Sequence, residues 1–143
     1  MATTVFQGNA TVNITQGVTS YDLSDQTTTA TLTVGKDALE VTAFGDTGHI
    51  FVGGLQTVEV TLSMFLSYGT GEVETGLAAM VGQGNTTIVI SPSGTTESAS
   101  NPEYTITNAM LASFTPINSV VGELARVDAV FTGGTWARDI TNP

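Results

Sequence analysis

The sequence predicts a mainly β domain, a sandwich or barrel with one helix beside it. The 26 threonines, 15 valines and 7 isoleucines make up about a third of the 143 residues, and such β-branched side chains suit a pleated sheet. Apolar and polar residues alternate with period two in several segments, which indicates strands with one buried face. Clusters of glycine and asparagine separate these segments and are typical of turns. The length fits a single domain, residues 1–143.

Two segments alternate most clearly, residues 57–66 and 125–131. The side chains expected on their polar faces are Thr57, Glu59, Thr61, Ser63, Phe65, Arg126, Asp128 and Val130. This polar side is either an ordinary wet face of a sheet or the lining of a lumen. The other segments expected to form strands are residues 10–15, 29–34, 38–44, 86–90 and 103–114.

One helix is expected at about residues 71–82, because apolar side chains recur there at i, i+4, i+7 and i+8. The residues of this stripe are Val73, Leu77, Met80 and Val81. Gly71 suits the N-cap, and Gly82 or Gly84 suits the end of the helix. Two polar, turn-rich stretches, residues 14–30 and 91–104, are expected to be exposed loops or arms.

Charge excludes several classes of partner. Thirteen acidic residues against three basic ones give a net charge of −10. Three cations cannot build a nucleic-acid-binding surface, and an anionic membrane surface would repel the chain. No apolar run is long enough to span a bilayer, and no secretory signal is expected. Without cysteine there are no disulfides and no thiolate chemistry, so we expect a chain made in a reducing cytosol.

The sequence points to no enzyme, cofactor or metal site. Asp46 and His49 could serve a serine or threonine nucleophile, but the preferred interpretation is that Asp46 caps a turn and His49 begins a strand. The segment "GTGEVETG" lacks the spacing of a phosphate-binding loop. Asp22 and Asp25 supply too few oxygens for calcium.

The stretch "LEVTAFGDTGHIFVGGLQTVEVTLSMF" resembles the signature of tail tube proteins from long-tailed, non-contractile (siphovirus-like) bacteriophages. In that family a strand ends in Phe-Gly-Asp, here Phe44, Gly45 and Asp46, and a Gly-Leu pair, here Gly54 and Leu55, opens a long alternating strand. The expected helix and the later strands also follow in the order of the family. The resemblance spans about residues 38–134, with residues 35–134 as its best-matching core.

The resemblance implies an antiparallel β-sandwich or half-barrel with one flanking helix, acting as a structural virion protein. Six copies would form a ring whose inner sheets join into a barrel around a lumen. Rings would stack into a tube through an arm, for which residues 15–29 are the candidate. The implied partners are further copies of the chain, a tape measure protein and a tail terminator. DNA would pass through without specific binding, no membrane would be involved, and the tail would assemble from protein made in the host bacterial cytoplasm.

On this view, the Phe-Gly-Asp turn with Gly54 and Leu55 sets the register of the long strand, since a one-residue slip would move its apolar side chains to the wrong face. The residues expected to face the lumen are Thr57, Glu59, Thr61, Ser63 and Asp128. Six copies at −10 give −60 per ring, so DNA would meet a repulsive wall along which it can slide.

Other functions remain open at this stage. A capsid decoration protein or a head–tail connector would also be a β-rich module without catalysis. A carbohydrate-binding or adhesion sandwich normally exposes aromatic side chains, and only 7% of this chain is aromatic, with Trp136 its one tryptophan. The tube of a contractile injection machine shares the ring architecture.

Overall fold

The computed structural model describes residues 10–92, 94 and 97–141. This part of the chain forms eight antiparallel strands and one helix. In chain order the elements are β1 (Thr11–Gln16), β2 (Thr19–Asp22), β3 (Thr27–Glu40), β4 (Phe51–Phe65), α1 (Val73–Met80), β5 (Thr86–Ser91), β6 (Glu103–Phe114), β7 (Arg126–Thr132) and β8 (Thr135–Asp139). The prediction of a mainly β sandwich or half-barrel with one flanking helix is confirmed.

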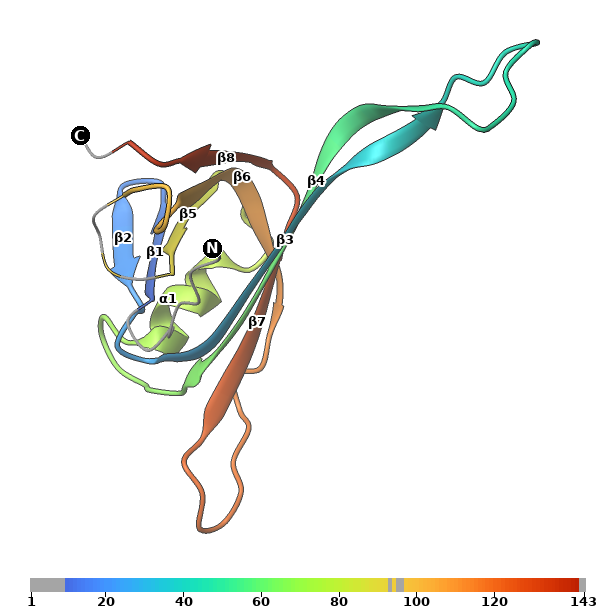
Figure 1. The fold of residues 1–143 in the computed structure, drawn as a ribbon. Helices are drawn as coiled ribbons and strands as arrows, with labels where there is room; N and C mark the ends of the chain where they lie inside the picture. Colours follow the sequence, from blue (N-terminus) through green and yellow to red (C-terminus); the bar gives the residue numbers. More distant parts are fainter. Residues whose placement is uncertain (1–9, 93, 95–96, 142–143) are drawn as a thin grey trace.

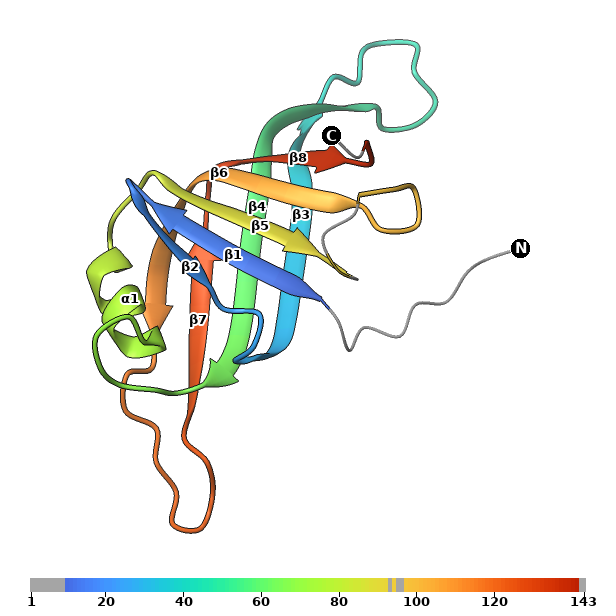
Figure 2. The ribbon, with the colours of Figure 1, turned by 90° about the vertical axis from the view of Figure 1, so that its left-hand side faces the viewer.

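The strands form two layers that share β6 (Figure 2). The short layer has the order β2-β1-β5-β6, with β8 on the other side of β6. The long layer has the order β6-β7-β4-β3. The first half of β6 pairs with β5 and β8, and its second half pairs with β7. Asn108 has a φ of +63° between the two halves, so β6 bends there and passes from one layer to the other.

The core lies between the two layers and is closed at one side by α1. The period-two pattern predicts one apolar face for residues 57–66 and one for residues 125–131. The side chains of these faces that are buried in the structure are Val58, Val60, Leu62, Met64, Val127, Ala129 and Phe131. The short layer contributes Val12, Ile14, Ile88 and Ile106, and α1 contributes Val73, Leu77 and Met80. Full burial of each larger side chain stabilises the fold by about 1.5–3 kcal/mol.

Two segments project from opposite ends of the sandwich (Figure 1). The hairpin of β3 and β4 continues well beyond the body and ends in residues 41–50; we call this end of the hairpin, residues 39–55, the arm. The connection between β6 and β7, residues 115–125, extends from the other end and is called the distal loop.

The boundaries of the long hairpin differ from the prediction. The two strands expected at residues 29–34 and 38–44 are one continuous strand, β3, which pairs with β4 from Thr27 to Glu40. β4 begins at Phe51, so Gly54 and Leu55 lie inside it and do not open it. A bulge between Lys36 and Ala38 sits opposite the glycines of β4, which leave room for the side chains that cross them.

The prediction of an exposed loop at residues 14–30 is wrong. This stretch holds the end of β1, all of β2 and the start of β3, and Leu23 within it is buried. Antiparallel pairing with β1 satisfies the backbone groups along one edge of β2 whatever its side chains are, so composition alone did not reveal the strand. Of the second expected loop, residues 92–102 do connect strands, but Ser91 ends β5 and β6 begins at Glu103; residues 93, 95 and 96 lie outside the described residues.

The helix is shorter than the expected 71–82 and begins later. Its N-cap is Glu72, and Gly71 with a φ of +81° belongs to the turn before it. Gly82 has a φ of +74° just after the helix, as expected for a C-terminal glycine. Val81 is exposed and lies outside the apolar stripe that packs on the core.

Candidate functional site

The candidate functional site is the outer face of the long layer, which we call the polar face. Each residue of this face alternates with a buried one on β4 and β7. Cross-strand register places Glu59 opposite Thr132, and Ser63 opposite Asp128. The hydroxyl of Ser63 donates a hydrogen bond of 2.6 Å to Oδ1 of Asp128. The structure therefore brings together all of Thr57, Glu59, Thr61, Ser63 and Asp128 on one surface.

Threonines from β3 extend the polar face. Thr33 pairs with Glu59, Thr31 with Thr61, and Thr29 with Ser63. Hydroxyl groups of this kind are well solvated and carry no charge. The face is thus wet but not densely charged.

The charges of the polar face nearly balance. Glu59 and Asp128 contribute two carboxylates and Arg126 contributes one guanidinium, which gives −1 from these three groups. Arg126 donates a hydrogen bond of 3.3 Å to the hydroxyl of Thr28, and its guanidinium carbon lies 5.0 Å from the ring centre of Phe65. Most of the net charge of −10 therefore lies on other surfaces.

The long layer ends in an open strand edge. Among the described residues β3 pairs only with β4, so the outer edge of its 14 residues has no neighbouring strand. A long, unpaired edge is a template for pairing with another chain. The geometry therefore favours a layer that is continued by a second molecule.

The Phe-Gly-Asp turn lies at the tip of the arm. Gly45 has a φ of +98°, which a residue with a side chain rarely adopts. Oδ2 of Asp46 accepts a hydrogen bond of 2.7 Å from the backbone nitrogen of Ala43, so the prediction that Asp46 caps the turn is confirmed. The ring of Phe44 is fully exposed, with a relative accessibility of 109%.

Asp46 and His49 do not form a catalytic pair. His49 forms an ion pair with the carboxylate of Glu40, which also accepts a hydrogen bond of 2.9 Å from the hydroxyl of Thr42. The prediction that His49 begins a strand is wrong, because β4 begins two residues later. These bonds fasten the two strands of the arm together near its tip.

The candidate calcium ligands also have a structural role. Oδ1 of Asp22 accepts a hydrogen bond of 3.1 Å from the backbone nitrogen of Ser24, and bonding to Ser24 lowers the pKa of Asp22. Within residues 10–92, 94 and 97–141, no three His, Cys, Asp or Glu side chains are grouped so that they could hold a metal ion. In the same residues no helix has the length and apolar character needed to cross a membrane.

The fold is one that occurs in tail tubes and injection-system particles, although no protein-family model and no curated protein matches the sequence. A chain of the SPP1 tail tube has a TM-score of 0.71 and 8% identity, covering 98% of this chain and 81% of that chain. A chain from the PVC sheath/tube terminator of an extracellular contractile injection system has a TM-score of 0.67 and 14% identity, covering 96% and 98%. A chain from the virion of a native gene transfer agent particle has a TM-score of 0.61 and 9% identity, covering 90% and 95%.

Proposed function

We propose that this chain is the tail tube subunit of a long-tailed, non-contractile bacteriophage, located in the virion. The observation that carries the proposal is a polar-faced long layer with an open edge, in a chain whose fold matches a tail tube chain over 98% of its length. Six copies form a ring in which the long layers join edge to edge into a barrel. The polar face of each copy lines the lumen, and no catalysis is involved.

Closure of a barrel accounts for the open edge of β3. In a ring, β3 of one subunit pairs with the long layer of its neighbour, so the long edge of β3 is no longer free to cause aggregation. The alternation of buried and polar residues on β4 matches the two environments of the strand in such a ring, because one side packs on the core and the other meets water in the lumen.

The lumen conducts DNA without binding it. Of the three cations of the chain only Arg126 lies at the polar face, at the start of β7 and above the ring of Phe65. The hydroxyls and the two carboxylates that each subunit contributes carry no positive charge to bind phosphates. DNA therefore slides along the lumen towards the host. The lining described here is mildly acidic, and the larger share of the charge keeps the outside of the tube soluble.

The arm, rather than residues 15–29, connects successive rings. Residues 15–29 are held in the body by β1, β2 and the start of β3, whereas the arm extends beyond it (Figure 1). The tube also contacts two other tail proteins. A tape measure protein lies inside it, and a tail terminator binds at its end.

The test is negative-stain electron microscopy of the purified protein across a salt series. We expect hollow tubes of constant diameter built from stacked rings. Particles that remain monomeric, or that close into trimers at every salt concentration, would contradict the proposal and favour a capsid decoration protein or a head–tail connector.

The tube of a contractile injection machine is a second candidate, because chains from the PVC sheath-tube complex share the fold, with a TM-score of 0.60 and 12% identity over 93% of this chain. The two assemblies differ in whether a sheath surrounds the tube. Cryo-electron microscopy of the native particle distinguishes them, since a sheath doubles the wall around the same inner barrel.

A further inference from the structure

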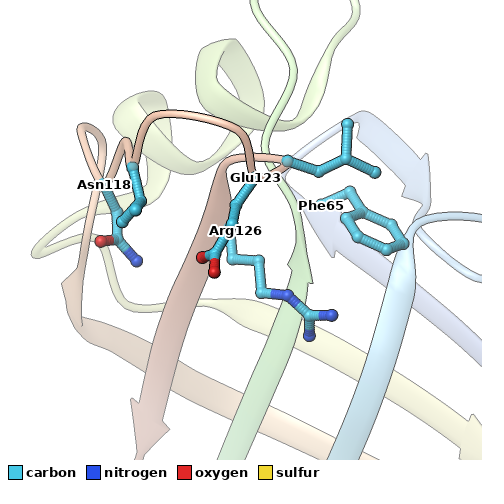
Figure 3. Close-up of a pocket in the computed structure, with 6 residues that line it drawn as sticks. Phe65, Asn118, Glu123 and Arg126 are labelled. Carbon is cyan, nitrogen blue, oxygen red and sulfur yellow. The ribbon is translucent and has the colours of Figure 1, made fainter.

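Two pockets of the described residues differ in the chemistry of their walls. The pocket in Figure 3 has a volume of about 470 Å³ and lies at the base of the distal loop, where Asn118, Glu123 and Arg126 give it a polar and charged wall. A second pocket of about 320 Å³ opens between β3 and the short layer, and no charged side chain lines it. We call this second pocket the side groove. Its lining residues are Ala10, Ala30, Leu32, Val34, Ile90, Pro92, Pro102 and Tyr104.

The side groove lies on the side of the sandwich opposite α1. Figure 2 shows the start of β1, the end of β5 and the start of β6 passing over β3 there, whereas α1 lies at the other side. Leu32, Ile90 and Tyr104 pack against the core but are only partly buried. The described part of the chain therefore leaves apolar surface uncovered in the groove, and burial of this surface would stabilise the fold.

The described part of the chain begins at the side groove. Ala10, which lines the groove, is the first described residue, and residues 1–9 lie outside the described residues. Those nine residues contain one aromatic side chain, Phe6, only four positions before Ala10. Four residues span at most about 14 Å, so Phe6 is within reach of the groove. Gly8 and Asn9 between them are typical turn residues, which allow the chain to change direction.

Composition also matches this segment to the side groove. Residues 1–9 contain no Asp, Glu, Lys or Arg, although the chain has thirteen acidic and three basic residues. Docking the segment in a groove without charged side chains therefore removes no charged side chain from water, a step that would be costly. An aromatic ring buries a large apolar area, and Tyr104 with two prolines offers it ring-shaped neighbours.

We propose that residues 1–9 dock in the side groove of their own chain, with Phe6 as the anchor. The segment then covers the partly buried side chains of β3, β5 and β6 and completes the core on the side opposite α1. Its own chain is favoured over a second copy because Ala10 is itself part of the groove wall, so the segment starts where it binds. Closing so short a loop costs little conformational entropy. The inference does not depend on the proposed function.

Crosslinking tests the docking directly, since the chain has no cysteine of its own. Gln7→Cys places a thiol next to the anchor, and Ala30→Cys places a second thiol at an exposed position in the groove wall. The double variant keeps Phe6 and is treated at low concentration with a short bismaleimide; mass spectrometry after proteolysis then identifies the link. Val18→Cys, at a fully exposed site on the turn between β1 and β2, replaces Ala30→Cys in the control.

The docking predicts a link within one chain between positions 7 and 30, and little or none between positions 7 and 18. Equal yields in the two double variants, or no link in either, would overturn it. The two single variants, Gln7→Cys and Ala30→Cys, are also mixed and treated in the same way. A dimer as the main product of that mixture would show that a second copy supplies the segment and would overturn docking within one chain.

A second measurement tests the anchor itself. Phe6→Ser should lower the equilibrium constant for folding by at least about tenfold, because full burial of a phenylalanine side chain contributes that much. Val18→Ser removes an apolar side chain that is exposed at 102% and should leave the constant unchanged. Urea unfolding of the monomeric protein measures both. Coinciding unfolding curves for the two variants would show that Phe6 is not buried and that the docking is wrong.

Discussion

Gly134 stands where the chain leaves the long layer and enters the short one, between β7 and β8. It has a φ of +88°, and a Cβ atom built on it would lie 2.3 Å from the carbonyl oxygen of Thr107 and 3.0 Å from the backbone nitrogen of Ala109. Both neighbours are backbone atoms of β6, so neither can turn aside. Gly133 is a matched control, because its φ is +82° but its Cβ atom would meet nothing within 4 Å.

Alanine at either position bears the cost of a left-handed backbone, about 1–2 kcal/mol. At Gly134 the overlap with β6 adds an overpacking cost of about 1–3 kcal/mol. We therefore expect Gly134→Ala to lower the free energy of unfolding by about 2–5 kcal/mol and Gly133→Ala by about 1–2 kcal/mol. For a chain of this size the melting temperature should fall by roughly 6–20 °C and 3–8 °C, respectively.

Urea unfolding at a concentration that keeps the protein monomeric measures the difference. Trp136, the single tryptophan, lies on β8 two residues beyond Gly134 and reports the release of that strand. Equal losses of stability for the two variants would refute the close approach of the turn to β6. A large loss for Gly133→Ala alone would contradict the described path of the chain between the layers.

Four further predictions follow from charge and from the arm. Burial and the neighbouring carboxylates of Glu97 and Asp139 raise the pKa of Glu103 from its ordinary value of 4.5, so the folded state gains stability as pH falls through the raised pKa and loses it as pH rises. Glu103→Gln should therefore raise the melting temperature near pH 7 and have no effect near pH 4, as thermal unfolding at both pH values will show. Tube assembly should be faster with added salt or divalent cations, because they screen a charge of −10 per subunit; light scattering that rises faster in low salt would contradict this. His49→Ala should leave tube formation nearly unchanged, since its pair with Glu40 is exposed; loss of infectivity with intact tubes would reopen a chemical role. Gly45→Val should impair folding or assembly, because valine does not tolerate a φ of +98°; wild-type melting and tubes would show that the turn does not depend on glycine.

Local pattern was sufficient for most of the secondary structure. β6 was expected at residues 103–114 and is found at Glu103–Phe114, because its alternation and its flanking polar residues are both contained in the sequence. The polar face was also predictable, since period two fixes which side chains share a side of a strand. Asp128 and Ser63 are 65 residues apart in the chain. Their place on the polar side of their strands was nevertheless predictable, because each lies at an alternate position of its own strand.

The strands that were missed owe their existence to their partners. β2 is four residues long and β8 is five, and neither alternates strongly. They are strands because β1 and β6 each offer them a ladder of backbone hydrogen bonds along one edge. Backbone pairing is independent of side-chain type, so the sequence carries no strong local signal of it.

The sequence by itself determined the class of fold, the buried and polar sides of the long strands, and the excess of negative charge. Only the tertiary structure decided how far β3 and β4 extend as one hairpin, that the arm and the distal loop project from opposite ends of the sandwich, and that β3 ends the long layer with an open edge. The physical reason is the range of the interactions. Alternation and turn chemistry act between near neighbours in the chain, whereas strand order and the positions of the two ends depend on pairings between residues far apart in it.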